Sequence, residues 1–420
     1  MPRRSLGEWL DFQETVHPRG IDLTLARVAE VGRRLALTSP AYRVITVAGT
    51  NGKGSTVEYC SRMLTAAGHR CGAFTSPHLL RYNERIRVDG TSVADDELVA
   101  AFEAIEQARG ELTLTFFEYN ALAALWLFRA REVDVAVLEV GLGGRLDAVN
   151  IVAADVAIVC SIGFDHRDWL GDTLEAIGRE KAGVFREGRP AVLADPEMTP
   201  AVAAQAARIG APVLWAARDY RIERGDAGQP WSLVWGERRW DALPVPSILG
   251  AVQIANAAAA IVAVANLPLR VPHEAIVSAL THARLPGRFQ RELIAGVEWV
   301  LDVAHNPPAA RVLAEQLAHT PVRGRRYTVA AILGDKDVDA IARELAPVTD
   351  EWVLCGIADP RGLAPEALAA RSVVFAGARL ADDIGAGVAL ARSLARGGDR
   401  VVVCGSFLAV APALAALGLY

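Results

Sequence analysis

A lysine and two hydroxyl residues stand within a run of glycines near the start of the chain. The run VAGTNGKGST occupies residues 47–56 after an apolar stretch, and its Lys53, Ser55 and Thr56 have the order of a phosphate-binding loop. Glycines let the backbone wrap closely around phosphate oxygens, and the start of the following helix attracts anions. We predict a nucleotide phosphate site made by Thr50, Asn51, Gly52, Lys53, Gly54 and Ser55. An ordinary glycine-rich turn is the alternative.

This loop departs from the usual G-x-x-x-x-G-K-[ST] pattern. Val47 stands where that pattern has its first glycine, and Gly54 follows the lysine where it has a hydroxyl residue. The departure leaves the role of Lys53 unchanged, because its mobile positive charge still follows a glycine turn.

Three further polar residues could take part in chemistry near such a loop. Glu139 ends an apolar run directly before GLGG, and His166 follows the next run within FDHRDW. Carboxylate oxygens suit Mg²⁺ better than an imidazole does. On residue type alone, Glu139 is a candidate metal ligand, whereas a lone histidine such as His166 is more often structural. Lys181, beside Glu180 in GREKAGVF, would ordinarily be a solvated surface residue.

The elements that must position these residues alternate between strands and helices. Apolar runs at 44–48, 135–140, 156–161 and 191–194 predict strands, and helical patterns occupy 55–67, 95–108 and 117–131. Continuous apolar strands are buried on both faces, which indicates a parallel sheet covered by helices. Gly49, Gly141 and Gly163 each follow a predicted strand, so their loops should converge at one edge of the sheet.

The second half of the chain changes character twice. Short tryptophan-rich segments within 213–243 predict a local hairpin, and Asn256 is placed to cap an alanine-rich helix. Strands at 298–303, 327–333, 351–355, 372–375 and 400–404 then predict a second αβ series. The predicted fold is α/β: a P-loop parallel-sheet ATPase domain over 1–287, followed by a smaller Rossmann-like domain over 288–420.

Composition excludes several classes of partner and location. The 420 residues carry a net charge of −5 with lysine and arginine spread throughout, which predicts neither a nucleic-acid nor a membrane-binding face. The five cysteines form no C-x-x-C pair, so a disulfide framework or thiolate zinc site is unexpected and the cytoplasm is the predicted location. The N-terminal segment lacks the apolar region of a signal peptide, and no apolar run reaches the ~20 residues of a membrane span.

Several longer motifs, in order along nearly the whole chain, resemble one enzyme family. They are SPHLLRYNERIRVDG (76–90), TFFEYNALAALWLF (115–128), LEVGLGGRLDAVN (138–150), FDHRDWLG (164–171), IGREKAGVF (177–185), LPGRFQ (285–290) and LDVAHNP (301–307). With the TNGKGS loop, they are similar to the folylpolyglutamate synthases of the Mur ligase superfamily, and more narrowly to the bacterial bifunctional dihydrofolate synthase/folylpolyglutamate synthases. The resemblance implies an ATP-dependent amide ligase: ATP phosphorylates a carboxylate, and the glutamate amine attacks the acyl phosphate.

The resemblance also implies roles for individual residues. Two Mg²⁺ ions, which Mn²⁺ is expected to be able to replace, would be held by Ser76, Glu139 and His166. A carbamate formed from CO₂ on Lys181 would support the second ion. The implied catalytic residues are Lys53, Lys181 and His305. Outside the loop, the implied ATP contacts are Asn256 at the adenine, Arg288 at the phosphates, and Asp302. Val252 replaces the histidine that is common in this superfamily, so packing around the adenine is expected to differ.

A pterin site is implied at three segments. Phe116 and Phe117 have flat rings that suit stacking on a pterin or aminobenzoate, although either could equally belong to the core. The implied pterin residues are Thr15, Val16, His17 and Pro18 of an N-terminal loop, Thr115, Phe116, Phe117 and Glu118, and Leu146, Asp147 and Ala148. The implied substrates are dihydropteroate, reduced folates and L-glutamate, and we expect a monomer.

Three other functions compete with this one. A cell-wall Mur ligase would normally need a further N-terminal domain, for which the ~48 residues before the phosphate loop leave no room. A P-loop nucleotide switch is less favoured because the chain has no evident guanine-reading N-K-x-D segment. A monofunctional folylpolyglutamate synthase is poorly separated by sequence from a bifunctional one.

Overall fold

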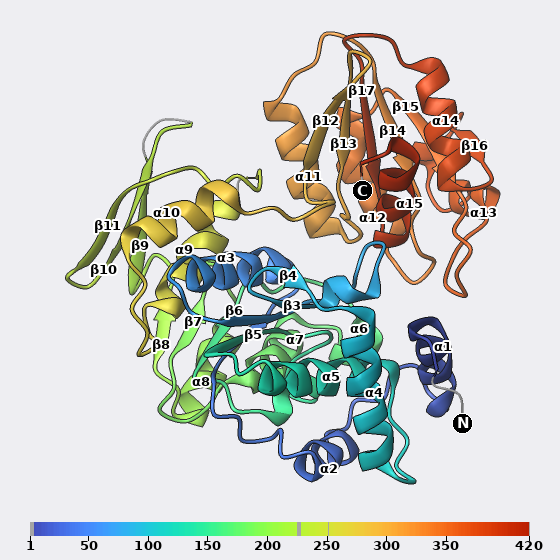
Figure 1. Ribbon diagram of the computed structural model, residues 1–420. Coiled ribbons are helices and arrows are strands. Elements are labelled where there is room, and N and C mark those ends of the chain that lie inside the picture. Colours follow the sequence, from blue (N-terminus) through green and yellow to red (C-terminus); the bar gives the residue numbers. More distant parts are fainter. Residues whose placement is uncertain (1–3, 225–227, 251, 420) are drawn as a thin grey trace. The chain divides into compact units, whose positions relative to one another are not determined.

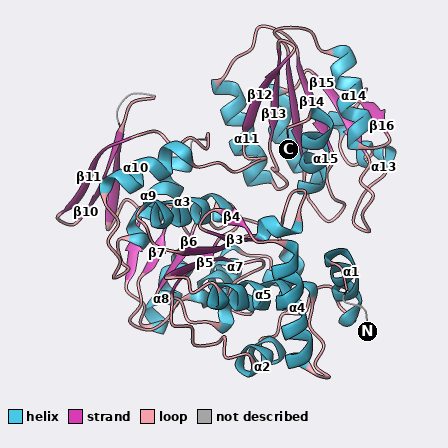
Figure 2. Cartoon of the chain, viewed as in Figure 1, coloured by secondary structure: helices cyan, strands magenta, loops and turns pink. Residues whose placement is uncertain are grey.

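The computed structural model describes residues 4–224, 228–250 and 252–419. The chain divides into two compact units: the first is Met1–Ser247 with Ile254–Ala283, and the second is Ile248–Gln253 with Arg284–Tyr420. Figures 1 and 2 show the helices and strands of each unit. The boundary between predicted domains 1–287 and 288–420 stays a prediction.

The first unit is built around an eight-stranded sheet with the order β4-β3-β2-β5-β1-β6-β7-β8. Its strands are β1 (Arg43–Ala48), β2 (Cys71–Phe74), β3 (Ile86–Val88), β4 (Thr91–Ser92), β5 (Val135–Glu139), β6 (Val156–Val159), β7 (Ala191–Leu193) and β8 (Val213–Trp215). The strands from β2 to β8 in this order are parallel, and β3 and β4 add an antiparallel edge. The predicted parallel sheet is therefore confirmed, and β1, β5, β6 and β7 coincide with the predicted runs.

Helices cover both faces of this sheet, as the continuous apolar strands require. They are α1 (Leu6–Val16), α2 (Ala26–Arg34), α3 (Lys53–Ala66), α4 (Asp95–Arg109), α5 (Phe116–Ala130), α6 (Arg167–Leu170), α7 (Leu174–Lys181), α8 (Pro200–Ile209), α9 (Gln253–Val264) and α10 (His273–His282). Short 3₁₀ turns lie at η1 (Tyr82–Arg85), η2 (Ala148–Ile151) and η3 (Ala182–Val184). Helix α3 packs against β1, β2 and β5 and is itself covered by α10 (Figure 1).

The opposite face packs on α4 and α5 through alternate residues of the strands. Ala136 and Leu138 of β5 join the same buried cluster as Phe102 of α4 and Leu125 of α5. A Cβ atom placed on Gly72 of β2 would come within 2.5 Å of the Phe128 ring, so α5 approaches the sheet at a point where only glycine fits.

The tryptophan-rich segment is more than a hairpin. Strands β9 (Tyr220–Arg224), β10 (Trp231–Trp235) and β11 (Arg238–Leu243) form a separate antiparallel sheet with the order β11-β10-β9. Residues 213–215 instead form β8 and join the main sheet beside β7. The hairpin prediction was therefore right for a local antiparallel pairing and wrong in its extent, because a three-residue strand carries too little periodicity to be assigned.

The second unit is a six-stranded sheet with the order β12-β13-β17-β14-β15-β16. Its strands are β12 (Gln290–Ile294), β13 (Val297–Leu301), β14 (Arg326–Ala330), β15 (Glu351–Cys355), β16 (Arg379–Ala381) and β17 (Arg400–Cys404). Its helices are α11 (Pro307–His319), α12 (Val338–Leu345), α13 (Pro365–Ala369), α14 (Ile384–Leu394) and α15 (Phe407–Leu417), with turns η4 (Ala346–Val348) and η5 (Val373–Phe375). From β13 onward the pairs are parallel, which confirms the predicted second αβ series.

One predicted strand of this unit is wrong. Residues 373–375 of this predicted strand form η5, Ser372 caps the turn by accepting a hydrogen bond from the Val374 N–H, and the edge strand is β16. The β-branched pair in SVVF favours a strand, but a side-chain cap at Ser372 gives the backbone a local alternative.

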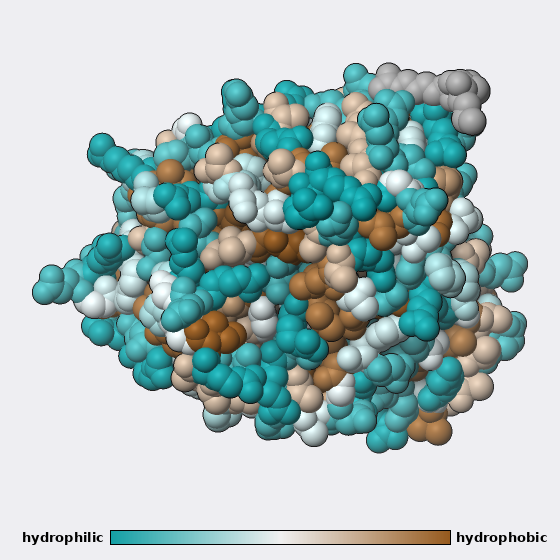
Figure 3. Space-filling view, turned by 90° about the horizontal axis from the view of Figure 1, so that it is seen from below, coloured by the Kyte–Doolittle hydropathy of each residue, from teal (hydrophilic) through white to brown (hydrophobic). Residues whose placement is uncertain are grey.

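The surface and the cysteines match an ordinary globular chain. All five cysteines are buried free thiols. Polar residues cover much of the face seen in Figure 3, and apolar residues lie in smaller patches between them. Across the described residues, every helix is too short or too polar to cross a membrane.

The contact between Gly72 and Phe128 gives a stability prediction. Gly72→Ala should lower the free energy of unfolding by about 1–3 kcal/mol, because the added methyl group overlaps a buried ring. Gly7→Ala is the matched control: nothing lies within 4 Å of a Cβ there, so no loss is expected. Urea unfolding of both variants measures the difference. Adding Phe128→Leu to Gly72→Ala should restore part of the loss, and equal stability of the two single variants would contradict the close packing.

Candidate active site

The glycine-rich loop after β1 is fixed by hydrogen bonds to the loop after β6. The Thr50 hydroxyl donates to the Gly163 carbonyl at 3.1 Å and accepts from the Gly163 N–H at 2.9 Å, and the Thr50 N–H donates to Ser161 O at 2.8 Å. The Asn51 N–H adds a bond to the Ser161 hydroxyl at 3.1 Å. These bonds join residues more than 100 positions apart and confirm that the two loops converge.

The loop turns into α3 at Gly52, which has a φ of 87°. A Cβ on this residue would lie 2.7 Å from Oδ1 of Asn256, so the side chain of α9 leaves no room for one. Asn256 is the fourth residue of α9, which begins at Gln253, so the prediction that it caps the helix is wrong. Its amide instead lies against the phosphate loop.

Two lysine side chains reach the same backbone oxygen. Lys53 Nζ donates to the carbonyls of Gly49 and Thr50 at 3.0 and 3.1 Å. Lys181 Nζ, from the last residue of α7, donates to the Gly49 carbonyl at 2.9 Å and is buried. The expectation from residue type alone, a solvated surface lysine, is wrong for Lys181.

The burial of Lys181 changes its protonation. Burial, together with the nearby charge of Lys53, lowers the pKa of the Lys181 ammonium group to about 7. Burial also raises the pKa of the Asp147 carboxyl to about 6, although N–H groups of Leu142 and Val149 donate to it at 2.9 and 3.0 Å. Both groups therefore titrate far closer to neutral pH than they would in water.

The predicted metal ligands come from three loops at the same edge of the sheet. Glu139 is the buried last residue of β5, and its Oε2 accepts the Ser76 N–H at 3.2 Å, so these two residues are brought together. His166 precedes α6 with a left-handed backbone, and its side chain is 36% exposed. The approach of His166 to Glu139 and Ser76 stays a prediction.

A carboxylate and a hydroxyl are the kind of partial ligand set that suits a magnesium ion, which does not need a full cage of protein ligands. Among the described residues, no group of three or more His, Cys, Asp and Glu side chains gathers in a way that could hold a metal. Magnesium keeps several waters and binds through one or two carboxylates plus substrate phosphates. Glu139 beside Ser76, next to a phosphate loop, has that composition.

The segment 115–118 begins α5, and two of its residues are explained by the helix itself. The Thr115 hydroxyl accepts from the Glu118 N–H at 3.3 Å, and Glu118 Oε2 accepts from the Thr115 N–H at 2.7 Å, which is a capping box. Phe117 packs against Phe74 at 5.8 Å between ring centroids, and its ring fills the space over Gly141. The predicted pterin segment is therefore in contact, through Phe117, with Gly141 directly after the strand end that carries Glu139.

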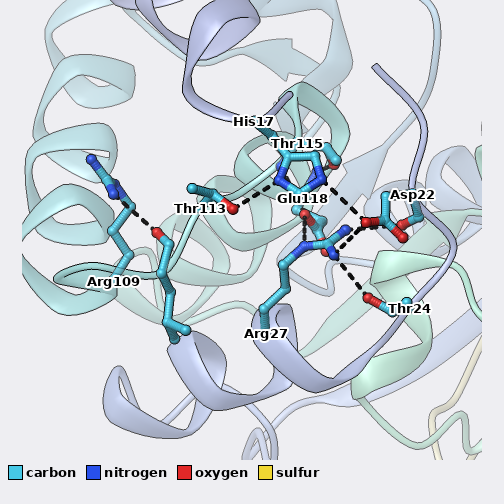
Figure 4. A network of polar contacts seen from close by, with 9 residues as sticks. His17, Asp22, Thr24, Arg27, Arg109, Thr113, Thr115 and Glu118 are labelled. Atoms are coloured by element: carbon cyan, nitrogen blue, oxygen red, sulfur yellow. Dashed lines mark hydrogen bonds and ion pairs between the residues drawn. The ribbon is translucent and has the colours of Figure 1, made fainter. Parts of the chain in front are cut away.

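Figure 4 shows a polar network that joins this segment to the N-terminal part of the chain. Arg27 donates to Glu118 Oε2 through Nε at 3.0 Å, to Asp22 Oδ2 at 2.9 Å, and to the Thr24 hydroxyl at 2.9 Å. His17 contacts Thr113 at 2.8 Å and Asp22 at 3.2 Å. Burial raises the pKa of Asp22, but Arg27 and His17 outweigh it and hold that pKa below its ordinary value.

The four predicted N-terminal pterin residues do not form one loop. Thr15 and Val16 are the last residues of α1, so the prediction of a loop is wrong for them. The Thr15 hydroxyl donates back to Phe12 O at 2.8 Å within the helix, and Pro18 is exposed. His17 is the member of this set that the network brings to the start of α5.

The remaining predicted residues lie in the second unit and are described by themselves. Asp302 follows β13, and its carboxylate accepts from the N–H groups of Phe289 and Ala304 at 2.7 and 2.8 Å. Burial raises its pKa, against the opposing charge of Arg288. The Arg288 guanidinium lies over the Phe407 ring at 4.9 Å, and the His305 ring is 6.4 Å from the same ring. Arg288, Asp302 and His305 thus gather at one end of the second sheet.

Sequence reasoning missed two arginines near these segments, Arg27 and Arg85. Arg85 stands in the charged stretch NERIRV, which suggests solvated surface, and Arg27 is a lone charge among the apolar residues of LARV. The available signal for Arg85 was its place within the motif SPHLLRYNERIRVDG, directly before the apolar Ile86 of a short strand. Such a position does not by itself distinguish an inward from an outward side chain.

The chain matches two family models and a set of known proteins. Residues 47–264 match the Mur ligase middle domain, and residues 287–407 match the Mur ligase glutamate ligase domain. The chain is 42% identical over 406 residues to the dihydrofolate synthase/folylpolyglutamate synthase of Escherichia coli strain K12, covering 97% of this chain and 94% of that protein.

Solved structures agree with this comparison. One, described as E. coli FolC in complex with DHPP and ADP, has a TM-score of 0.95 and 40% identity over 100% of this chain and 99% of that one. Another is a bifunctional folylpolyglutamate synthase/dihydrofolate synthase with Mn, AMPPNP and L-glutamate bound, with a TM-score of 0.92 and 43% identity over 99% and 98% of the two chains.

The network in Figure 4 predicts a specific cost for losing Arg27. Arg27→Met should lower the free energy of unfolding by roughly 3 kcal/mol, because it leaves the buried Glu118 carboxylate without its cation. Arg33→Met is the matched control: its pair with Glu30 is exposed and should contribute less than about 1 kcal/mol. Thermal melting of both variants provides the measurement. Adding Glu118→Gln to Arg27→Met should recover much of the loss, and equal melting of the two arginine variants would contradict the role of the pair.

Proposed function

The chain belongs to the dihydrofolate synthase/folylpolyglutamate synthases of the Mur ligase family, and we propose which of its residues carry out the ATP-dependent addition of glutamate. The observation that supports the proposal most strongly is the convergence at the Gly49 loop. Lys53 and Lys181 donate to one carbonyl, and the loop is tied to the segment after β6. The family predicted from sequence is confirmed by the two Mur ligase domain matches and by the 42% identity to the E. coli protein.

The reaction joins a carboxylate to an amine, which does not proceed unaided in water. The substrate carboxylate oxygen attacks the γ-phosphorus of ATP, the bond to ADP breaks, and an acyl phosphate forms. The glutamate α-amine then attacks the acyl carbon, phosphate leaves, and the amine loses a proton. We assign Lys53, with the backbone N–H groups of residues 50–55, to offsetting negative charge on the phosphates.

Magnesium fits the residues at the strand ends. Glu139 and Ser76 would hold the first ion, and we propose that His166 contributes to a second, with Mn²⁺ able to replace Mg²⁺ because an imidazole suits it better. The Mn and AMPPNP in the related structure support a divalent metal and an ATP-type ligand here. The ion supplies charge neutralisation on the phosphate oxygens.

We further propose that Lys181 is carbamylated. Two ammonium groups at one carbonyl oxygen repel each other, and the lowered pKa leaves a large fraction of Lys181 neutral near pH 7. Only the neutral amine has the lone pair to attack CO₂: a nitrogen–carbon bond forms, a proton leaves, and a cation becomes an anion. An anion beside Lys53 and the metal site is favourable where a second ammonium group is not.

The pterin end of the substrate is assigned to the segments joined in Figure 4. Glu118 uses Oε2 for Thr115 and Arg27, and among the described residues its buried Oε1 has no hydrogen-bond partner. A pterin carries ring and amino N–H donors of the kind that this oxygen lacks. Phe116 begins α5, which packs against η2, and Asp147 caps η2 by accepting the Val149 N–H. The DHPP bound in the E. coli relative supports a folate-type ligand.

The second unit would complete the enzyme. We assign Arg288 to the phosphates, Asp302 to the ATP site and His305 to the same centre, by resemblance and because the three gather at one end of their sheet. Asn256, against Gly52, remains our candidate for the adenine contact. We also propose a location in the cytoplasm, for which the five buried free thiols are the support, and we keep the expectation of a monomer.

ADP release tests the function directly. With ATP, Mg²⁺ and L-glutamate present, dihydropteroate and a reduced folate should each stimulate ADP release, since the bifunctional relatives carry both names. Lys53→Met should lower this rate by more than about 100-fold, because charge on the transferring phosphate is left uncompensated. Arg62→Met, on the same helix, is the control and should retain the rate.

Two outcomes would change the assignment. Stimulation by the reduced folate alone would make the chain a monofunctional folylpolyglutamate synthase. ADP release that does not depend on glutamate would instead return the nucleotide switch to consideration.

Carbamylation of Lys181 predicts a dependence on CO₂. Protein prepared without CO₂ and bicarbonate should lose most of its ligase rate and regain it on adding bicarbonate, and native mass spectra should show one CO₂ gained. Because the neutral amine is the reactive form, the gain should be faster above pH 7 than below it. Lys181→Ala should be nearly inactive and partly rescued by a small carboxylate such as acetate. Full activity of protein whose mass shows a bare amine would rule the carbamate out.

A further inference from the structure

Arg85 ends the short turn η1 directly before β3 and is almost completely buried. Its residue is 7% exposed, and burial lowers the pKa of its guanidinium, which nonetheless remains a cation at neutral pH. Removing such a group from water is costly unless its N–H donors find acceptors. The contacts of Arg85 meet that need only in part.

The Nε edge of the Arg85 guanidinium makes a hydrogen bond within the protein. Nε donates to Nδ1 of His78 at 2.7 Å, and the plane lies near the rings of Tyr82 and Phe116, with Cζ 5.6 and 5.5 Å from their centroids. In the described part of the chain, this is the guanidinium's one hydrogen bond. The Nη edge, which carries the fork that binds carboxylates in a bidentate way, has no protein acceptor there.

Among the described residues, the other buried arginine is bonded differently. Arg400, in the second unit, is 2% exposed, but its nitrogens donate to Glu298 and to the carbonyls of Leu317 and Thr320. The partly buried Arg27 is likewise surrounded by acceptors. The guanidinium donors of Arg400 and Arg27 thus meet acceptors on several sides, whereas among the described residues the Nη edge of Arg85 meets none.

Arg85 adjoins both halves of the proposed site within the first unit. Its own carbonyl accepts from the N–H of Thr75, the residue before Ser76, at 2.9 Å. The charge of Glu139, the proposed metal ligand, acts on it, and Phe116 belongs to the proposed pterin segment. An anion recognised at the Nη edge would therefore lie next to the metal and phosphate end and next to an aromatic ring.

We infer that the Nη edge of Arg85 binds the substrate carboxylate that ATP phosphorylates. The inference rests on the proposed function. In that function, the Arg85 guanidinium selects an aryl or glutamyl carboxylate and holds it beside the phosphate loop. His78 fixes the fork by accepting from Nε, and the rings of Tyr82 and Phe116 hold its plane.

The test compares two ligands on matched variants. Binding of dihydropteroate, and of its carboxamide in which the carboxylate is replaced, is measured by calorimetry with a non-hydrolysable ATP analogue present. Arg85→Met should weaken dihydropteroate by about 10–100-fold, because a charge-assisted pair to the carboxylate is lost, and should leave the carboxamide within about twofold. Arg81→Met, an exposed arginine of the same segment, should change neither affinity.

Each alternative outcome has a distinct meaning. If Arg85→Met weakens both ligands equally, or weakens neither, then Arg85 only supports packing and the inference is overturned. If Arg85→Met melts below the assay temperature, Arg85→Lys is tested in its place, because it retains a cation without the fork. The inference then requires Arg85→Lys to weaken the binding of dihydropteroate and to leave the binding of the carboxamide unchanged. If the unchanged protein does not bind dihydropteroate, the proposed function fails, and the assignment of Arg85 with it.

Discussion

The Gly49 carbonyl accepts hydrogen bonds from Lys53 at the start of α3 and from Lys181 at the end of α7. This oxygen therefore ties the phosphate loop to two helices that are far apart in sequence. The arrangement brings two positive groups together in a buried place, where charge interactions are stronger than in water. The negative charge of nucleotide phosphates relieves that crowding, as would the carbamate proposed on Lys181, so the ligand-free site is electrostatically incomplete.

The number of hydrogen-bond acceptors around the guanidinium distinguishes two arginines of the first unit. Arg27 has acceptors around its whole guanidinium, and Glu118 shares one of them, so this pair belongs to the scaffold that joins the N-terminal segment to α5. Arg85 has a single acceptor and two ring faces. A buried cation is retained where something compensates it, so the lack of an acceptor at the whole Nη edge of Arg85 favours a bound anion there.

The sequence predicted the parts of the fold that follow from local pattern. Continuous apolar runs identified β1, β5 and β6, and the order glycine, lysine, hydroxyl identified the loop. Local pattern failed at Ser372, where a side-chain hydrogen bond replaces the backbone pairing of a strand. It also failed at Asn256, because helix α9 begins earlier than its alanine-rich stretch. It could not find Arg85 or the burial of Lys181, because the direction of a charged side chain is decided by packing between segments distant in sequence.

The packing of α10 on α3 affects how the chain folds during its synthesis. Helix α10, at residues 273–282, packs on α3, at 53–66, and the first unit is completed by residues 254–283 that follow a short segment of the second. A ribosome that has produced the phosphate loop must add some two hundred further residues before that helix is covered. The nascent first unit thus carries an incomplete apolar surface during most of its synthesis, a stage at which chains of this size are prone to misassociation.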